Sequence, residues 1–168
     1  MNDLILLAML LEGPKHGYQL KQQAGLIMGQ GDMHNNLVYP LLRRFTDKGW
    51  VTRKAVAGER GQTRQQYALT PLGRKTLIER LSQYGERNSD SFPGFAMRVG
   101  MFEALKPATR EHILKQRENY LQERDQKLAA LQGNMDLGKY GGEVVGYLRS
   151  QFEAELNWIQ RLSRMVKN

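Results

Sequence analysis

Basic side chains gather in one short stretch of the sequence, between residues 43 and 64. Seven arginines and lysines stand there against two carboxylates, those of Asp47 and Glu59. The basic residues are Arg43, Arg44, Lys48, Arg53, Lys54, Arg60 and Arg64. Such cations can neutralise phosphates or donate hydrogen bonds to base edges, which is the chemistry of a nucleic-acid surface. A solvated charged face that binds nothing is the plainer alternative.

Catalytic chemistry has no comparable grouping of residues. His16, His34 and His112 are dispersed, with neither metal-ligand spacing nor the partners of a catalytic triad. Gly29 and Gly31 lack the strand-then-helix context of a phosphate-binding loop. The sequence has no cysteine, which excludes disulfides, thiolate chemistry and a cysteine zinc site. We therefore expect a protein that is not an enzyme and that uses no metal and no cofactor.

A helix over residues 36–49 is predicted to carry the first part of the basic cluster. Apolar residues recur at helical spacing along one side of it: Leu37, Val38, Leu41, Leu42 and Phe45. Asn36, Tyr39 and Arg43 fall on the opposite side, with Arg44 at the edge of the apolar stripe. The helix should therefore bury one face and present a polar, basic face outward.

Two strand-like runs, residues 50–57 and 62–69, follow this helix and flank a glycine-bracketed turn. A short basic helix followed by a hairpin with a basic tip is the layout of a winged helix-turn-helix, in which the helix enters the major groove of DNA. The hairpin tip would contact backbone or minor groove. The predicted DNA-binding residues are Asn35, Asn36, Tyr39, Arg43, Arg44, Lys48, Arg60, Thr63 and Arg64.

The charge of the chain is concentrated in its first half. The formal charge is +8, with 12 basic and 6 acidic residues up to Gly85, and 13 and 11 after it. The segment 85–91 is polar and free of apolar residues, so we expect a boundary there. This predicts a DNA-binding domain over 1–85 and a helical domain over 86–168. The apolar run 4–11 is too short for a membrane span and lacks the features of a signal peptide.

The second half of the chain is predicted to be helical, with two long helices separated by a glycine-rich loop over 133–142. Each helix has a narrow apolar seam at heptad spacing, and Glu155 interrupts the second seam. The seam residues are Leu114, Leu121 and Leu128, then Val145, Leu148, Phe152, Ile159 and Leu162. Such seams favour pairing with a second copy of the chain, although a helical hairpin within one chain is an alternative.

Four motifs resemble the PadR family of winged-helix, usually dimeric bacterial transcription regulators. They are the sequences at 10–20 (LLEGPKHGYQL), 38–45 (VYPLLRRF), 48–51 (KGWV) and 66–73 (QYALTPLG). The second half resembles the virulence-activator-type region of one PadR subfamily, which wraps a partner subunit. The resemblance implies that Tyr39 bonds phosphate, although core packing is an equal alternative for its ring. It also implies that Tyr18 lies near an effector such as a phenolic acid. Met97, Met101 and Trp158 would supply apolar walls of that site, although such residues are more often ordinary core.

Together these observations predict a mainly α-helical protein with a small β-hairpin wing, acting in the cytoplasm as a homodimeric regulator. We expect a repressor that binds a palindromic duplex and responds to a small aromatic effector. The alternative from another class is a helical adaptor whose winged helix binds protein and whose basic face only aids solubility.

Overall fold

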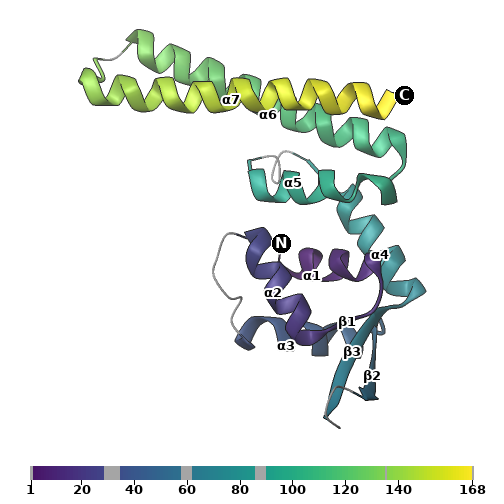
Figure 1. The fold of residues 1–168 in the computed structure, drawn as a ribbon. Coiled ribbons are helices and arrows are strands. Elements are labelled where there is room, and N and C mark those ends of the chain that lie inside the picture. The colour runs from purple at the N-terminus through teal and green to yellow at the C-terminus, as the bar shows by residue number, and fades with distance from the viewer. Residues whose placement is uncertain (1, 29–34, 58–61, 86–89, 135, 168) are drawn as a thin grey trace. The chain divides into compact units, whose positions relative to one another are not determined.

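The computed structural model describes residues 2–28, 35–57, 62–85, 90–134 and 136–167. The chain forms two compact units, Met1–Gln83 and Tyr84–Asn168, whose elements are labelled in Figure 1.

The first unit is a small helical bundle with a three-stranded sheet. Its elements are α1 (Asn2–Met9), the 3-10 helix η1 (Leu10–Glu12), β1 (Lys15–His16), α2 (Gly17–Met28), α3 (Asn35–Asp47), β2 (Val51–Ala57), β3 (Thr63–Leu69) and α4 (Pro71–Ser82). Leu6, Leu7, Leu20, Leu77 and Leu81 are completely enclosed, so the apolar faces of α1, α2 and α4 share one core.

The basic helix α3 buries the side that its spacing predicts. Val38, Leu42 and Phe45 are fully buried, whereas Leu37 and Leu41 are half-buried at the margin of the stripe. The helix ends through a pair of backbone bonds of the Schellman type, Gly49 N to Thr46 O at 2.9 Å and Trp50 N to Phe45 O at 2.9 Å.

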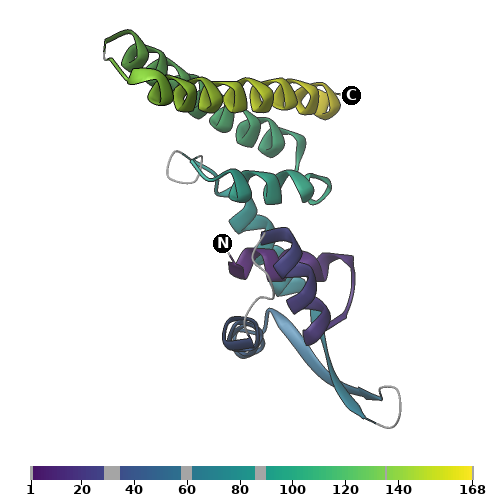
Figure 2. The ribbon, with the colours of Figure 1, turned by 60° about the vertical axis from the view of Figure 1, so that its left-hand side comes forward.

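The sheet has the strand order β1–β3–β2, and all its pairings are antiparallel. β2 and β3 form the expected hairpin, which extends away from the helices of the first unit (Figures 1 and 2). Arg53 pairs with Tyr67 across the two strands. The third strand was not expected, because β1 has two residues and a run that short shows no alternation of its own.

The start of α4 fixes the hairpin to the end of α3. The Thr70 hydroxyl caps α4 by accepting from the Gly73 N–H at 2.9 Å, and it also donates to the Gly49 carbonyl at 2.7 Å. A Cβ on Gly73 would lie 2.0 Å from the Trp50 carbonyl oxygen, so only glycine permits this approach. Leu72, in the first turn of α4, is exposed.

The second unit consists of helices. They are α5 (Phe92–Gly100), the 3-10 helix η4 (Phe102–Ala104), α6 (Pro107–Asn134) and α7 (Gly138–Lys167). α6 and α7 lie side by side in both views (Figures 1 and 2). The loop predicted over 133–142 is wrong for most of its length, because α7 already begins at Gly138, whose N–H donates to the Asp136 carboxylate at 2.9 Å. Packing along the hairpin outweighs the weak helix propensity of glycine there.

A buried ion pair joins the two long helices. Arg117 Nε and Nη2 donate to the two oxygens of Glu155 at 2.7 and 2.9 Å, and the Arg117 side chain is 4% exposed. The guanidinium also lies 5.7 Å from the Phe95 ring centroid and 5.2 Å from that of Tyr120. Glu155 therefore interrupts the apolar seam of α7 in order to pair with a charge on α6.

Candidate nucleic-acid interface

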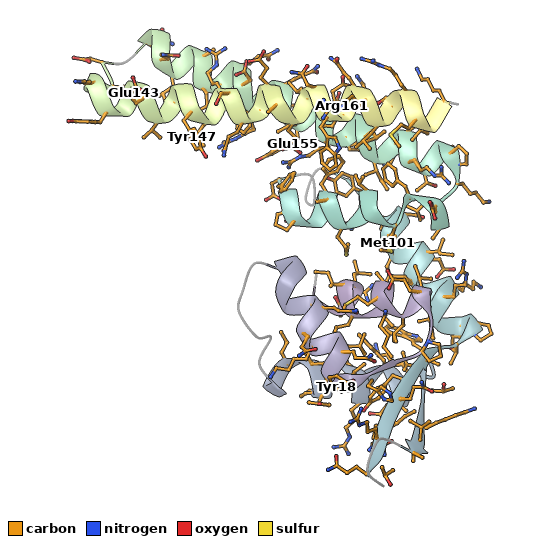
Figure 3. The ribbon with its side chains drawn as sticks, viewed as in Figure 1. Tyr18, Met101, Glu143, Tyr147, Glu155 and Arg161 are labelled. Atoms are coloured by element: carbon orange, nitrogen blue, oxygen red, sulfur yellow. The ribbon has the colours of Figure 1, made fainter. Side chains whose placement is uncertain are left out.

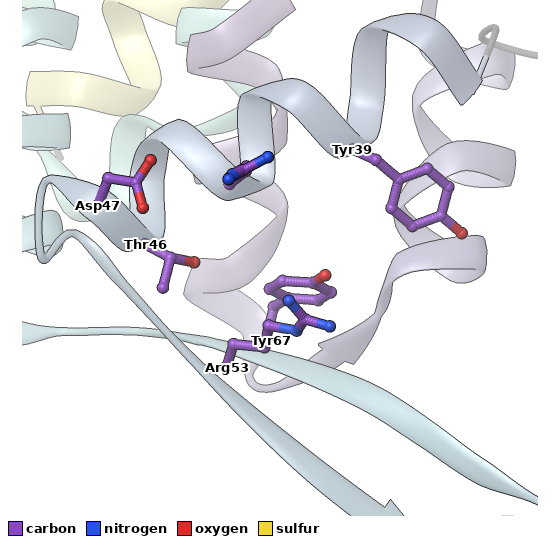
Figure 4. Close-up of a pocket in the computed structure, with 6 residues that line it drawn as sticks. Tyr39, Thr46, Asp47, Arg53 and Tyr67 are labelled. Carbon is purple, nitrogen blue, oxygen red and sulfur yellow. The ribbon is translucent and has the colours of Figure 1, made fainter.

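A cleft of about 440 Å³ separates α3 from the sheet in the first unit. Tyr39 and Arg43 line it from α3, and Arg53 and Tyr67 line it from β2 and β3 (Figure 4). Thr46 and Asp47 close it at the carboxyl end of α3. The cleft thus combines two guanidinium groups with two phenol hydroxyls.

A second cleft of about 290 Å³ adjoins the first and shares Tyr39, Arg53 and Tyr67 with it. Arg64 contributes the additional cation, and His16, Tyr18 and Gln65 complete the wall. We call the shared channel the arginine–tyrosine groove and define it by Tyr39, Arg43, Arg53, Arg64 and Tyr67. Among the residues that the structure describes, three arginines and one carboxylate, that of Asp47, line its two clefts.

Polar and ring contacts hold the groove side chains in place. Arg53 Nε donates to the Gln65 side chain at 2.9 Å, and the Arg64 guanidinium lies 5.7 Å from the Tyr18 ring centroid. The His16 ring stacks on Tyr18, with centroids 5.8 Å apart and planes 7° apart. The His16 backbone N–H donates to the Gln19 side chain at 2.8 Å, so this histidine anchors the start of α2.

Gly17 and Tyr39 explain why two separate motifs belong together. A Cβ on Gly17 would lie 2.8 Å from Cε1 of the Tyr39 ring, closer than such atoms normally approach. The glycine that opens α2 therefore makes room for the tyrosine of α3 at the mouth of the groove, where Tyr39 is 43% exposed.

The electrostatics of the groove favour a bound anion. Burial raises the pKa of the Tyr67 hydroxyl; the positive charge of Arg53 opposes this shift and Tyr39 adds to it. Tyr67 therefore remains a neutral hydroxyl, and it can donate a hydrogen bond to an anion in the cleft that Arg43 and Arg53 also line. Phosphate oxygens are suitable acceptors for such a set of donors.

The predicted DNA-binding residues do not all lie together. Tyr39, Arg43 and Arg64 line the groove, and Thr63 is exposed on β3. Arg44 instead lies 3.8 Å from the Asp3 carboxylate, which Arg80 also binds at 2.7 Å. The ammonium of Lys48 lies 4.7 Å from the Trp50 ring centroid. The side chains of Asn35 and Asn36 and all of Arg60 fall outside the described residues.

Arg53 and Tyr67 are groove residues that the sequence reasoning did not include among the site residues. The strand alternation contains the signal, because Arg53 lies two residues after buried Val51 and Tyr67 lies two residues before Leu69. Residues two apart in a strand share a face of the sheet, so both side chains face the same way as the apolar residues that pack beneath α3.

The residues predicted to contact an effector lie in different parts of the fold. Tyr18 is on α2 of the first unit and is 44% exposed. Met97 is buried on α5, Met101 follows that helix half-buried, and Trp158 is half-buried on α7. Tyr18 and Met101 are labelled in Figure 3.

The predicted dimerisation residues are largely covered within the single chain. Leu114, Leu121, Val145, Ile159 and Leu162 are buried in the second unit. Leu128, Leu148 and Phe152 are half-buried. These three side chains keep part of their surface exposed, so the role of the seams in a dimer stays a prediction.

Two classes of feature are missing from the part of the chain that the structure describes. No three histidine, aspartate or glutamate side chains gather there as metal ligands would. None of the helices described is both long enough and apolar enough to span a bilayer.

The first unit, with its helices, its hairpin and its basic groove beside α3, defines a winged helix-turn-helix protein, and the predicted fold class is confirmed. Residues 6–79 match the model of the transcriptional regulator PadR-like family, which covers most of the unit. The match contains all four motifs, so the predicted resemblance to the PadR family is confirmed over residues 6–79.

Comparison with solved structures gives further similarities. The protein TA0346 from Thermoplasma acidophilum is 29% identical over 46% of this chain and 74% of its own, with a TM-score of 0.44. PadR of Bacillus subtilis, solved in complex with operator DNA, is 20% identical over 98% of both chains, with a TM-score of 0.48. A Streptococcus mutans protein, smu.1604c, is 18% identical over 95% of this chain and 96% of its own, with a TM-score of 0.42. No curated protein matches the sequence.

Proposed function

We propose that this PadR-like regulator is a cytoplasmic, homodimeric repressor that binds a palindromic duplex through the arginine–tyrosine groove and α3. The observation that carries the proposal is the convergence of Arg43, Arg53 and Arg64 with two tyrosine hydroxyls in one channel. This set of donors matches a phosphate backbone better than it matches an apolar protein partner.

In this proposal α3 enters the major groove by its first turns, and the groove holds the adjacent phosphates. Tyr39 lies on the exposed side of α3 and can donate its hydroxyl to a phosphate, with Arg43 one turn further along. The hairpin would follow the backbone or the minor groove. Residues 1–85 would bind DNA, and residues 86–168 would bring two copies together.

The proposed dimer uses the half-buried seam residues Leu128, Leu148 and Phe152 together with the exposed side of α7. Tyr140, Val144 and Tyr147 occur at intervals of four and three residues and are 81%, 58% and 64% exposed. Apolar side chains so exposed on one face of a helix favour a contact with the same face of a second copy. Two reading helices would then face half-sites about 34 Å apart, one turn of duplex.

A small aromatic effector would relieve repression by binding one arrangement of the dimer more tightly than the other. Its differential affinity would change the separation of the two reading helices, and the affinity for operator would fall accordingly.

Selection of bound fragments from a random duplex library tests the DNA assignment. We expect enrichment of an inverted repeat whose half-sites are one helical turn apart. A library that remains random after repeated selection would instead favour the adaptor function.

Sedimentation of the protein without DNA tests the dimer. Tyr147→Glu should shift the protein towards monomer, whereas Leu72→Glu, which changes an exposed apolar residue of the first unit in the same way, should not. A dimer that tolerates Tyr147→Glu and Val144→Glu would contradict the α7 interface.

A further inference from the structure

A cavity of about 500 Å³ opens in the second unit where α5 lies against the helical hairpin. It is separate from the arginine–tyrosine groove, and every residue that lines it belongs to the second unit. Its volume lies within the range of small-molecule sites, roughly 300 to 1,000 Å³.

Aromatic rings form the walls of this cavity. Phe92 from α5 and Phe152 and Trp158 from α7 line it. The Phe92 and Trp158 ring centroids are 6.2 Å apart, and Trp158 in turn meets the fully buried Phe95 edge-on at 5.6 Å. Phe95 thus supports Trp158 from behind, so the indole is held in place and the cavity suits a flat ring system.

The polar groups of the cavity are unequally accessible. Arg117 is bound to both oxygens of Glu155 and enclosed between the Phe95 and Tyr120 rings, with 4% of its side chain exposed against 12% for Glu155. The amide nitrogen of Gln151 donates to the Tyr147 hydroxyl at 2.8 Å, which leaves its oxygen as an acceptor. Figure 3 shows Tyr147 and Glu155 on the same helix.

Among the residues that the structure describes, the cavity therefore presents aromatic faces and hydrogen-bond acceptors, and the cation that lines it, Arg117, is enclosed. An ammonium group beside Glu155 would be a second cation on that carboxylate, and it would also be attracted by the ring faces. A ligand carboxylate would first meet the carboxylate of Glu155 and the side-chain oxygen of Gln151, both of which repel it. It would have to displace Glu155 to reach the guanidinium of Arg117.

We propose that this cavity binds a planar aromatic amine, and that aromatic carboxylates are excluded from it. If the proposed function is correct, such an amine is the effector, and this consequence alone rests on the proposed function. Binding itself depends on the second unit alone.

Calorimetric titration of the full chain, without DNA, tests the site with two probes of matched size and opposite charge, 2-naphthylmethylamine and 2-naphthoate. We expect saturable binding of one amine per chain, at least tenfold tighter than binding of the carboxylate. Glu155→Gln should weaken the amine about tenfold, which is the loss expected for a partly desolvated charge contact. Glu153→Gln makes the same charge change on α7 outside this cavity and should alter affinity by less than twofold.

Phe92→Ala provides a second variant that does not disturb the core, because Phe92 is 49% exposed. It should weaken the amine about fivefold and decides the question if Glu155→Gln lowers the melting temperature. Equal or tighter binding of 2-naphthoate would overturn the proposal, and so would unchanged amine affinity in Phe92→Ala. Absence of saturable binding would also overturn it, including the case in which a second copy of the chain fills the cavity.

The same titration separates this inference from the proposed function. Amine binding by a protein that selects no duplex would leave the cavity assigned and the regulator proposal refuted. Selection of an inverted repeat by a protein that binds neither probe would give the opposite result.

Discussion

Replacing Arg43 by alanine should change the salt dependence of DNA binding more clearly than it changes stability. Arg43 is exposed on α3 and lines the groove. Alanine is the best helix former, so the helix should keep its conformation. Each lost phosphate contact reduces the slope of log affinity against log salt by about 0.9. A dimer loses one contact per copy, or about 1.8 in the slope.

That change in slope has a measurable consequence between 50 and 200 mM salt. Over this fourfold range the wild-type protein should lose about twelvefold more affinity than Arg43→Ala does. Fluorescence anisotropy on the selected duplex, at five or more salt concentrations, measures both slopes. The melting temperatures of the two proteins should agree within a few degrees, which excludes unfolding as the cause.

Arg74→Ala is the matched control, because Arg74 is an exposed arginine of α4 in the same unit and does not line the groove. Its slope should equal that of the wild-type protein. Arg64→Ala should behave like Arg43→Ala. If the Arg43 and Arg64 variants keep the wild-type slope, or if Arg74→Ala loses as much of it as they do, the assignment of phosphate contacts to the groove is refuted.

Three further changes probe other parts of the structure. Gly17→Ala should push the Tyr39 ring aside and lower operator affinity about tenfold, and Tyr39→Ala should do the same, while the free energy of unfolding in urea changes by less than about 1 kcal/mol. Arg117→Met should lower the unfolding free energy by about 3 kcal/mol, because Glu155 is left mostly buried without its cation, and adding Glu155→Leu should restore most of that loss. Burial raises the pKa of Tyr84 to about 12, so the folded state keeps a proton that the unfolded state loses near pH 10. The free energy of unfolding should therefore fall by up to about 3 kcal/mol between pH 10 and 12. Urea titrations of Tyr84→Phe should show a fall that is smaller by this amount.

Local patterns were sufficient to predict the winged helix. The spacing of Val38, Leu42 and Phe45 predicted the buried side of α3, and the glycine-bracketed turn predicted the hairpin. Thr70 followed by Pro71 is a typical helix start, and Thr70 caps α4. Each of these features depends on residues close together in the sequence, where periodicity and capping chemistry apply directly.

Long-range pairings could not be predicted in the same way. The sequence does not reveal that Arg44 reaches Asp3 while its neighbour Arg43 lines the groove. Successive side chains of a helix point in different directions around its axis, and the sequence alone does not show what each direction meets. Nor does heptad spacing distinguish a seam satisfied within one chain from a seam between two chains. The burial of Leu121 and Ile159 within the second unit is a property of the hairpin connection, which places the seams opposite each other.

The close approach of Gly17 to Tyr39 bears on any attempt to redesign which base sequence the protein reads. Transplanting the outer residues of α3 from a relative would carry over the tyrosine but not the space that it needs. A set of residues transferred to change the base preference should therefore include position 17 together with α3. A recipient protein with a larger side chain at that position should fail to take on the new preference.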